Sequence, residues 1–126
     1  MNTFSKTELV DEMLAQTELI YQNNVRLAAS QTSQELNETE IELLNAALYH
    51  AILHETNLHN GKSKYSNDDM RKTALVRQAA LSGELKTLKA ARRTDLEAQI
   101  NLKADTEKRR QTFRIAELNL LWLMGN

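Results

Sequence analysis

The sequence contains no cysteine and no proline, and it has few glycines and aromatic residues. Among its 126 residues there are three Gly, two Phe, three Tyr and one Trp. Without cysteine, disulfides and thiolate metal sites are excluded. Without proline, no residue removes the backbone donor that a helix interior needs. The remaining composition is rich in Leu, Ala, Glu, Lys, Arg and Gln, which favour helices, so we expect an all-α protein.

Long apolar runs and catalytic motifs are also missing. The longest apolar stretch near the C-terminus is Leu120 to Met124, which is too short to cross a bilayer. The N-terminal segment MNTFSKTELVDEML carries acids and lacks the apolar core of a signal peptide. There is no Gly-rich phosphate loop and no nucleophile elbow. We therefore expect a cytoplasmic, non-enzymatic protein with no cofactor and no membrane partner.

The charges are unevenly distributed, although the formal net charge is only −1. Residues 1–63 hold three basic and nine acidic side chains, a net charge of −6. Residues 64–126 hold thirteen basic and eight acidic side chains, a net charge of +5. Opposite charges attract, so this division favours a fold in which the two halves lie side by side.

The first half shows the periodicity of a long helix. Ser5 and Glu8 have the spacing of a capping box, which predicts a helix start near residue 6. The segment SQTSQELNETE, residues 30–40, is polar but contains no Gly or Pro, and we interpret it as part of one continuous helix. The alternative is a break at residues 30–38. Apolar residues recur at helical spacing on both sides of it: Val10, Met13, Leu14, Ile20, Val25, Leu27, Ala28, Ile41, Leu44, Leu48 and Ile52.

The stretch NLHNGKSKYSNDDMRK, residues 57–72, interrupts this periodicity near the middle of the chain. Asn60-Gly61 is a helix C-terminal signal, because Gly accepts the left-handed conformation. Ser66 or Asn67, followed by Asp68 and Asp69, is typical of a helix start. The sequence thus predicts a first helix over about 6–59, a connecting loop over 60–67 and a second helix over about 68–124.

The second helix carries its own stripe. Steps of four and three residues give the positions Leu81, Leu85, Leu88, Arg92, Asp95, Gln99, Leu102, Thr106, Arg109, Phe113, Ala116, Leu120 and Leu123. The stripe is mostly polar between about residues 92 and 110. Gly83 lies within this pattern at a cost of about 1 kcal/mol relative to Ala, and we expect the helix to continue through it.

These patterns predict a single domain, an antiparallel hairpin of two long helices, either continuous or broken. Folding at the central loop pairs residues whose numbers add up to about 127, which sets polar segment against polar segment and Leu14 near Phe113. Each helix would be about 80 Å long. One partner helix does not cover stripes this wide, so we expect a homodimer that forms a four-helix bundle. The alternative is a compact monomer with breaks at 30–38 and 82–83. Self-association is assigned to Phe113, Leu120, Leu121, Trp122 and Leu123.

The segment HAILHETNLH places His50 and His54 one helical turn apart, where both side chains could bind one metal ion. Residues 54–59 are one residue longer than the H-E-x-x-H motif of zinc proteases. The extra residue moves His59 off the face of His54, which excludes that motif. Exposed histidines near the end of the hairpin are the simpler interpretation, and no metal is expected.

Basic residues in the second half suggest a nucleic-acid surface as an alternative function. The residues concerned are Lys86, Lys89, Arg92, Arg93, Lys108, Arg109 and Arg110. Phosphate neutralisation requires such charges to converge on one face. Acids interrupt them and no aromatic residues for base stacking lie nearby, so a solvated or interhelical charged face is favoured.

The loop residues Gly61, Tyr65, Asn67 and Arg71 also carry a resemblance. The stretch YSNDDMRKTAL, followed by a charged helix that ends in FRIAELNLL, resembles a group of small helical-hairpin proteins of phage and prophage regions. The similarity spans Tyr65 to about Leu123. It implies a phage-type accessory protein linked to replication or recombination. From the residues alone, Asn67 is explained as a helix cap and Tyr65 as a side chain packed over the loop.

The sequence therefore favours a helical assembly protein that self-associates and presents a helical surface to a protein partner. A nucleic-acid-associated accessory protein is the second hypothesis, and a histidine-based metal-binding protein is the third.

Overall fold

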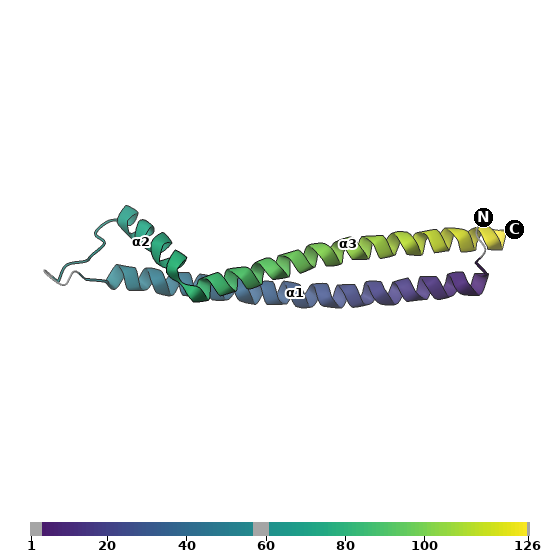
Figure 1. Cartoon of the computed structure of the whole chain (residues 1–126), viewed down its shortest axis with the longest axis horizontal. Coiled ribbons are helices and arrows are strands. Elements are labelled where there is room, and N and C mark those ends of the chain that lie inside the picture. Colours follow the sequence, from purple (N-terminus) through teal and green to yellow (C-terminus); the bar gives the residue numbers. More distant parts are fainter. Residues whose placement is uncertain (1–3, 57–60, 126) are drawn as a thin grey trace. The chain divides into compact units, whose positions relative to one another are not determined.

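Three α-helices make up most of the described chain (Figure 1), and the all-α prediction is confirmed. The computed structural model describes residues 4–56 and 61–125. The helices are α1 (Lys6–His54), α2 (Asp68–Leu81) and α3 (Gly83–Gly125). The chain divides into two units, each considered by itself. We call residues 1–32 with 96–126 the terminal unit and residues 33–95 the loop unit.

Helix α1 begins where the capping box predicts. The Ser5 hydroxyl accepts a hydrogen bond from the backbone N–H of Glu8 at 3.2 Å and lies 3.3 Å from the Glu8 carboxylate. The helix then continues through residues 30–40 without a break, as expected. The polar side chains there bond within the helix: Thr32 donates to the carbonyl of Ala28 and Thr39 to that of Glu35. These bonds give both hydroxyls a partner within the helix itself.

Helix α1 ends at His54, so the predicted end near residue 59 is wrong. The chain after it forms a short ladder across the loop. The backbone N–H of Lys64 donates to the Glu55 carbonyl at 2.9 Å, and Thr56 pairs with Ser63 in an antiparallel bridge. The Lys64 ammonium lies 3.1 Å from the Glu55 carboxylate. These pairings satisfy backbone groups that would otherwise extend the helix. Leu58 and His59 lie outside the described residues.

The predicted second helix is interrupted, so its single span over 68–124 is wrong. Helix α2 ends at Leu81 because Ser82 adopts an extended conformation, with its backbone N–H bonded to the Ala79 carbonyl at 3.2 Å. The Ser82 hydroxyl then accepts the backbone N–H of Leu85 at 3.2 Å and caps α3. The side chain of one serine therefore starts the new helix, at the break that the compact-monomer alternative contained.

In the terminal unit, the N-terminal part of α1 lies beside the C-terminal part of α3 (Figure 1, purple and yellow). Shielded positions on α1 recur at steps of four and three, as they do in coiled coils. They include the apolar Leu9 and the buried polar side chains of Gln16 and Asn23. On α3 the buried positions are Gln99, Thr106 and Ala116. This seam is partly polar along its length.

Leu14, expected near Phe113, is 64% exposed, and Met13 occupies the shielded position in its place. The shielded face of α1 is therefore offset by one residue from the predicted one. Steps of four and three that start at the buried Leu9 lead to Met13 and Gln16 and pass over Leu14.

The loop unit contains the most completely buried side chains of the described residues. Ile52 of α1 and Leu85 of α3 are both 0% exposed, and Ala74 of α2 is also buried. The carboxylate of Asp95 accepts hydrogen bonds from Ser33 at 2.8 Å and from Asn37 at 3.1 Å. Leu81, expected in the stripe, is 78% exposed because α2 ends there.

The predicted antiparallel pairing is confirmed within each unit. In the terminal unit Asn23 bonds Asp105, and in the loop unit Ser33 bonds Asp95. Both pairs of residue numbers add up to 128, close to the predicted 127. The observed and predicted sums differ by only one, so the predicted register is correct to within about one residue, or about 1.5 Å along the helix.

Candidate functional site

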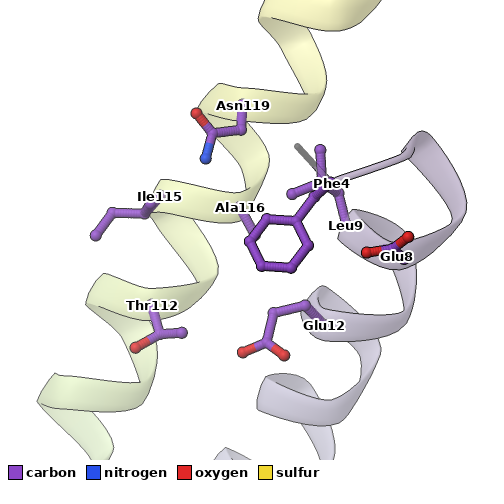
Figure 2. A pocket seen from close by; sticks show the side chains of 8 residues that line it. All are labelled: Phe4, Glu8, Leu9, Glu12, Thr112, Ile115, Ala116 and Asn119. Carbon is purple, nitrogen blue, oxygen red and sulfur yellow. The ribbon is translucent and has the colours of Figure 1, made fainter. Parts of the chain in front are cut away.

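A groove lies at the end of the terminal unit, between the start of α1 and the end of α3 (Figure 2). Its volume is about 300 Å³. Figure 2 shows the Phe4 ring between the two helices, with the Glu12 carboxylate beneath it and Ile115 on the outer side of α3. Leu9 and Ala116 are buried beneath the groove. We call this the acid-rimmed groove; its lining residues are Phe4, Glu8, Leu9, Glu12, Thr112, Ile115, Ala116 and Asn119.

The two carboxylates of the groove are positioned by local bonds on α1. Glu8 completes the capping box with Ser5, and Oε1 of Glu12 accepts a 2.7 Å hydrogen bond from Nε2 of Gln16. Among the described residues, no basic side chain forms an ion pair with either carboxylate. Like charges four residues apart on a helix repel each other. The groove therefore favours an apolar group that is accompanied by positive charge.

The predicted self-association residues fall into two classes. Leu121 and Trp122 are 56% and 69% exposed. Phe113, Leu120 and Leu123 are half-buried at shielded positions of the α3 stripe. Leu121 and Trp122 thus expose apolar surface, while the other three are shielded along the seam of the terminal unit.

The same unit exposes further large apolar side chains that the sequence analysis did not assign to association. On α3 these are Ile115, Leu118 and Met124, and on α1 they are Val10, Leu14, Tyr21 and Val25. The signal was present in the sequence, because positions 10, 14, 21 and 25 recur at steps of four and seven. They form a second apolar stripe on α1 beside the one that faces α3.

A second hollow lies on a different side of α3 and is basic. It is lined by Thr17 and Ile20 of α1 and by Arg110, Phe113, Arg114 and Glu117 of α3. Both arginines are exposed, and each approaches a glutamate on its own helix: Arg110 lies 3.9 Å from Glu107 and Arg114 lies 3.8 Å from Glu117. Exposed pairs at such distances contribute little to stability, so these arginines can bind elsewhere at small cost.

The candidate nucleic-acid residues do not form one set. In the loop unit Lys86, Lys89 and Arg93 are exposed, while Arg92 is half-buried at a shielded position of α3. In the terminal unit Arg109 is half-buried, and its Nε atom donates to Oδ2 of Asp105 at 3.4 Å. Lys108 and Arg110 are exposed. Arg92 and Arg109 thus lie along the seams rather than on an open basic face.

The histidine rings of His50 and His54 lie 4.4 Å apart, centroid to centroid, and both side chains are exposed. The neighbouring Glu55 carboxylate is bonded to Lys64. This ion pair also raises the pKa of Lys64 above its ordinary value, because the carboxylate accepts its hydrogen bond and attracts its charge. Within residues 4–56 and 61–125, no group of three His, Cys, Asp or Glu side chains is placed to hold a metal ion.

The residues of the loop motif have local structural roles. Gly61 has a φ of 66°, the left-handed conformation that its position was expected to require. The Asn67 side chain accepts the backbone N–H of Met70 at 2.9 Å and caps α2, as predicted. The Tyr65 carbonyl accepts hydrogen bonds from Ser63 and from Nε of Arg71. These contacts explain the motif through the geometry of the loop.

None of the described helices has the length and apolar character needed to cross a membrane.

Comparisons with protein-family models, with curated proteins and with solved structures found no match for this chain.

Proposed function

We propose that this chain is a non-enzymatic helical assembly protein, which self-associates through the terminal unit and presents a helical surface to a protein partner. The observation that carries the proposal is an inversion of polarity in that unit. Gln16, Asn23, Gln99 and Thr106 are buried in its seam, while Leu118, Leu121 and Trp122 are exposed on α3.

This inversion costs free energy in an isolated chain. Polar side chains in the seam occupy positions where apolar side chains would give hydrophobic stabilisation. Apolar area stabilises by about 25 cal/mol per Å² only when it is removed from water, so the exposed area of the leucines and tryptophan contributes nothing in an isolated chain. Contiguous exposed apolar patches commonly mark protein interaction sites. We call the exposed Leu118, Leu121 and Trp122 the α3 patch. A second copy of the chain that covers this patch supplies the apolar burial that the seam lacks, most simply in a homodimer with four packed helices.

Trp122 provides the direct test, because it is the only tryptophan in the chain. On dilution from tens of micromolar, its fluorescence emission is expected to shift to longer wavelength as the patch becomes hydrated. Sedimentation velocity over the same concentrations should show conversion from a larger species to a monomer. A compact monomer at the highest concentration, with constant emission, would refute the proposal.

A pair of variants distinguishes association through the α3 patch from nonspecific association through any exposed leucine. Leu121→Lys in α3 is expected to weaken association about tenfold or more, because it places a charge in the covered area. The matched control is Leu43→Lys, at an exposed leucine of α1 in the loop unit. The control should associate like the wild type.

A second function draws support from Lys86, Lys89 and Arg93. Their spacing of three and four residues places these exposed basic side chains on one face of α3 in the loop unit. We propose nucleic-acid association through this face as the alternative, in keeping with the phage-type role that the sequence resemblance implies. Binding of a fluorescent DNA duplex that weakens steeply with salt, and is lost in a Lys86→Glu/Lys89→Glu variant, would favour it. Absence of binding at low salt would exclude it.

A further inference from the structure

The terminal unit carries two surfaces of complementary chemistry on different sides of α3. The acid-rimmed groove involves Thr112, Ile115 and Asn119 of this helix, whereas the basic hollow involves Arg110 and Arg114. The arginines continue along α3 into two exposed leucines. We call Arg110, Arg114, Leu118 and Leu121 the arginine ridge; they are spaced by four, four and three residues and therefore share one face of the helix.

We propose that the acid-rimmed groove binds the arginine ridge of a second copy of this chain. The inference rests on the proposed function, since it specifies how self-association occurs. It names the occupant of the groove from charge complementarity. Two carboxylates line the groove and form no ion pair within the described residues, and two weakly paired guanidinium groups precede the leucines of the ridge.

The spacing of the charges matches along the helix axis. Glu8 and Glu12 are four residues apart, and so are Arg110 and Arg114, which corresponds to about 6 Å in both helices. If the incoming α3 runs antiparallel to α1, Arg114 lies beside Glu8 and Arg110 beside Glu12. The same alignment carries Leu118 one turn past Glu8, beyond the start of α1 at Lys6, where the chain continues to Phe4.

This contact joins unlike surfaces, and that determines the assembly. After one groove has taken one ridge, the first copy still has its own ridge and the second copy still has its own groove. Such heterologous contacts form rings when the rotation closes and open chains when it does not. This contact therefore keeps the self-association of the proposed function but replaces its simplest form, the homodimer, by assemblies larger than a dimer.

Charge reversal tests each surface separately. A Glu8→Lys/Glu12→Lys variant and an Arg110→Glu/Arg114→Glu variant are each expected to raise the dissociation constant of self-association about tenfold or more, because each replaces attraction by repulsion. Two controls keep the same helices and the same change in charge. They are Asp11→Lys/Glu18→Lys on α1 and Lys103→Glu/Lys108→Glu on α3, all at exposed positions outside both hollows.

Mixing the two defective variants gives the decisive result. The first retains an intact ridge and the second an intact groove, and their two reversed surfaces also attract each other. Each variant alone should stay dissociated, whereas the mixture should form alternating assemblies larger than a dimer in sedimentation velocity. A chain with all four reversals restores complementarity with the signs exchanged and should form the larger assemblies again. A mixture that stays monomeric, or a wild type that stops at a dimer, would overturn the proposal.

Folding is controlled independently, because Glu8 also belongs to the capping box of α1. Ser5→Ala breaks the same cap without changing the rim charge, and it should associate like the wild type when helix content by circular dichroism is equal. The neutral variant Glu8→Gln/Glu12→Gln keeps a capping side chain. It should associate more weakly than the wild type and depend less on salt.

The outcomes distinguish this inference from the broader function. A wild type that remains monomeric at every concentration contradicts both. A wild type that associates, with the groove and ridge variants associating equally well, contradicts the groove-and-ridge contact alone.

Discussion

The Nδ2 atom of Asn23 donates a hydrogen bond of 2.7 Å to Oδ2 of Asp105, and this bond joins α1 to α3 inside the terminal unit. It is the main cause that lowers the pKa of Asp105 below its ordinary value of 3.8; partial desolvation opposes it and the charge of Arg109 supports it. A polar side chain buried in a seam thus holds a carboxylate in its charged form.

The first prediction concerns pH. Because the pKa of Asp105 is lower in the folded chain than in the unfolded chain, its contribution to stability is present above pH 3.8 and is lost as pH falls through the lowered value. Asn23→Ala should therefore destabilise the chain near neutral pH, and the difference in Tm from the wild type should shrink in acid. Thermal melts followed by circular dichroism from about pH 7 to about pH 2 measure this.

The control for this experiment is Asn24→Ala, at the exposed neighbouring position. It should show no comparable change with pH. A gap between wild type and Asn23→Ala that stays constant through the acid range would contradict the assignment of the lowered pKa to this bond.

The second prediction concerns the most buried side chains. Leu85→Ala should lower the free energy of unfolding by about 2–5 kcal/mol, because it removes buried methyl groups and leaves a cavity. Leu85 is 0% exposed, whereas Leu81, only four residues earlier, is 78% exposed. Leu81→Ala should therefore change the free energy of unfolding by about 0.5 kcal/mol or less. Urea denaturation measures both, and equal losses would contradict the burial of Leu85.

The third prediction contrasts two glycines. Gly83 starts α3 and has no atom within 4 Å of an added Cβ, so Gly83→Ala should stabilise the chain by up to about 1 kcal/mol. Gly61 also has open space, but its φ of 66° is costly for alanine, and Gly61→Ala should destabilise the chain by about 1 kcal/mol. Opposite shifts in Tm are expected for the same chemical change, and shifts of one sign would contradict this account.

The fourth prediction concerns the start of α2. Asn67→Ala removes the acceptor of the Met70 N–H and should cost about 1 kcal/mol. Ser66→Ala, at the adjacent exposed position, serves as the control and should cost less, because Ser66 donates only a 3.6 Å contact to the Met70 sulfur. A larger loss in the Ser66 variant would place the cap one residue earlier.

The parts of the fold that depend on neighbouring residues could be predicted from the sequence. The capping box at Ser5, the cap at Asn67 and the left-handed Gly61 each require only a few adjacent positions. The stripe of α3 was also predictable, because a repeat of four and three residues defines a helix face.

The errors arose from a contact between distant residues in one case and from an ambiguous local signal in the other. Helix α1 ends at His54 because Glu55 pairs with Lys64 across the loop, and no local signal marks that end. The break at Ser82 was underestimated because one serine both ends α2 and caps α3.

The candidate site was predicted in part. Exposure of Leu121 and Trp122 followed from an apolar segment with more than one apolar side. The acid-rimmed groove could not be predicted in this way, because the sequence indicates only a helix cap for Glu8 and a surface charge for Glu12. Its depth depends on how α1 and α3 pack around Ala116, which is a property of the folded pair.

The aspartates of α3 have a consequence for folding accuracy. Two helices with uniform leucine stripes can slide by a whole heptad and still match. In this chain such a slip would separate Asp105 from Asn23 in the terminal unit and Asp95 from Ser33 and Asn37 in the loop unit. The register of each unit is thus defined by its own polar contacts. Misaligned forms lose charge-assisted hydrogen bonds that apolar contacts do not replace.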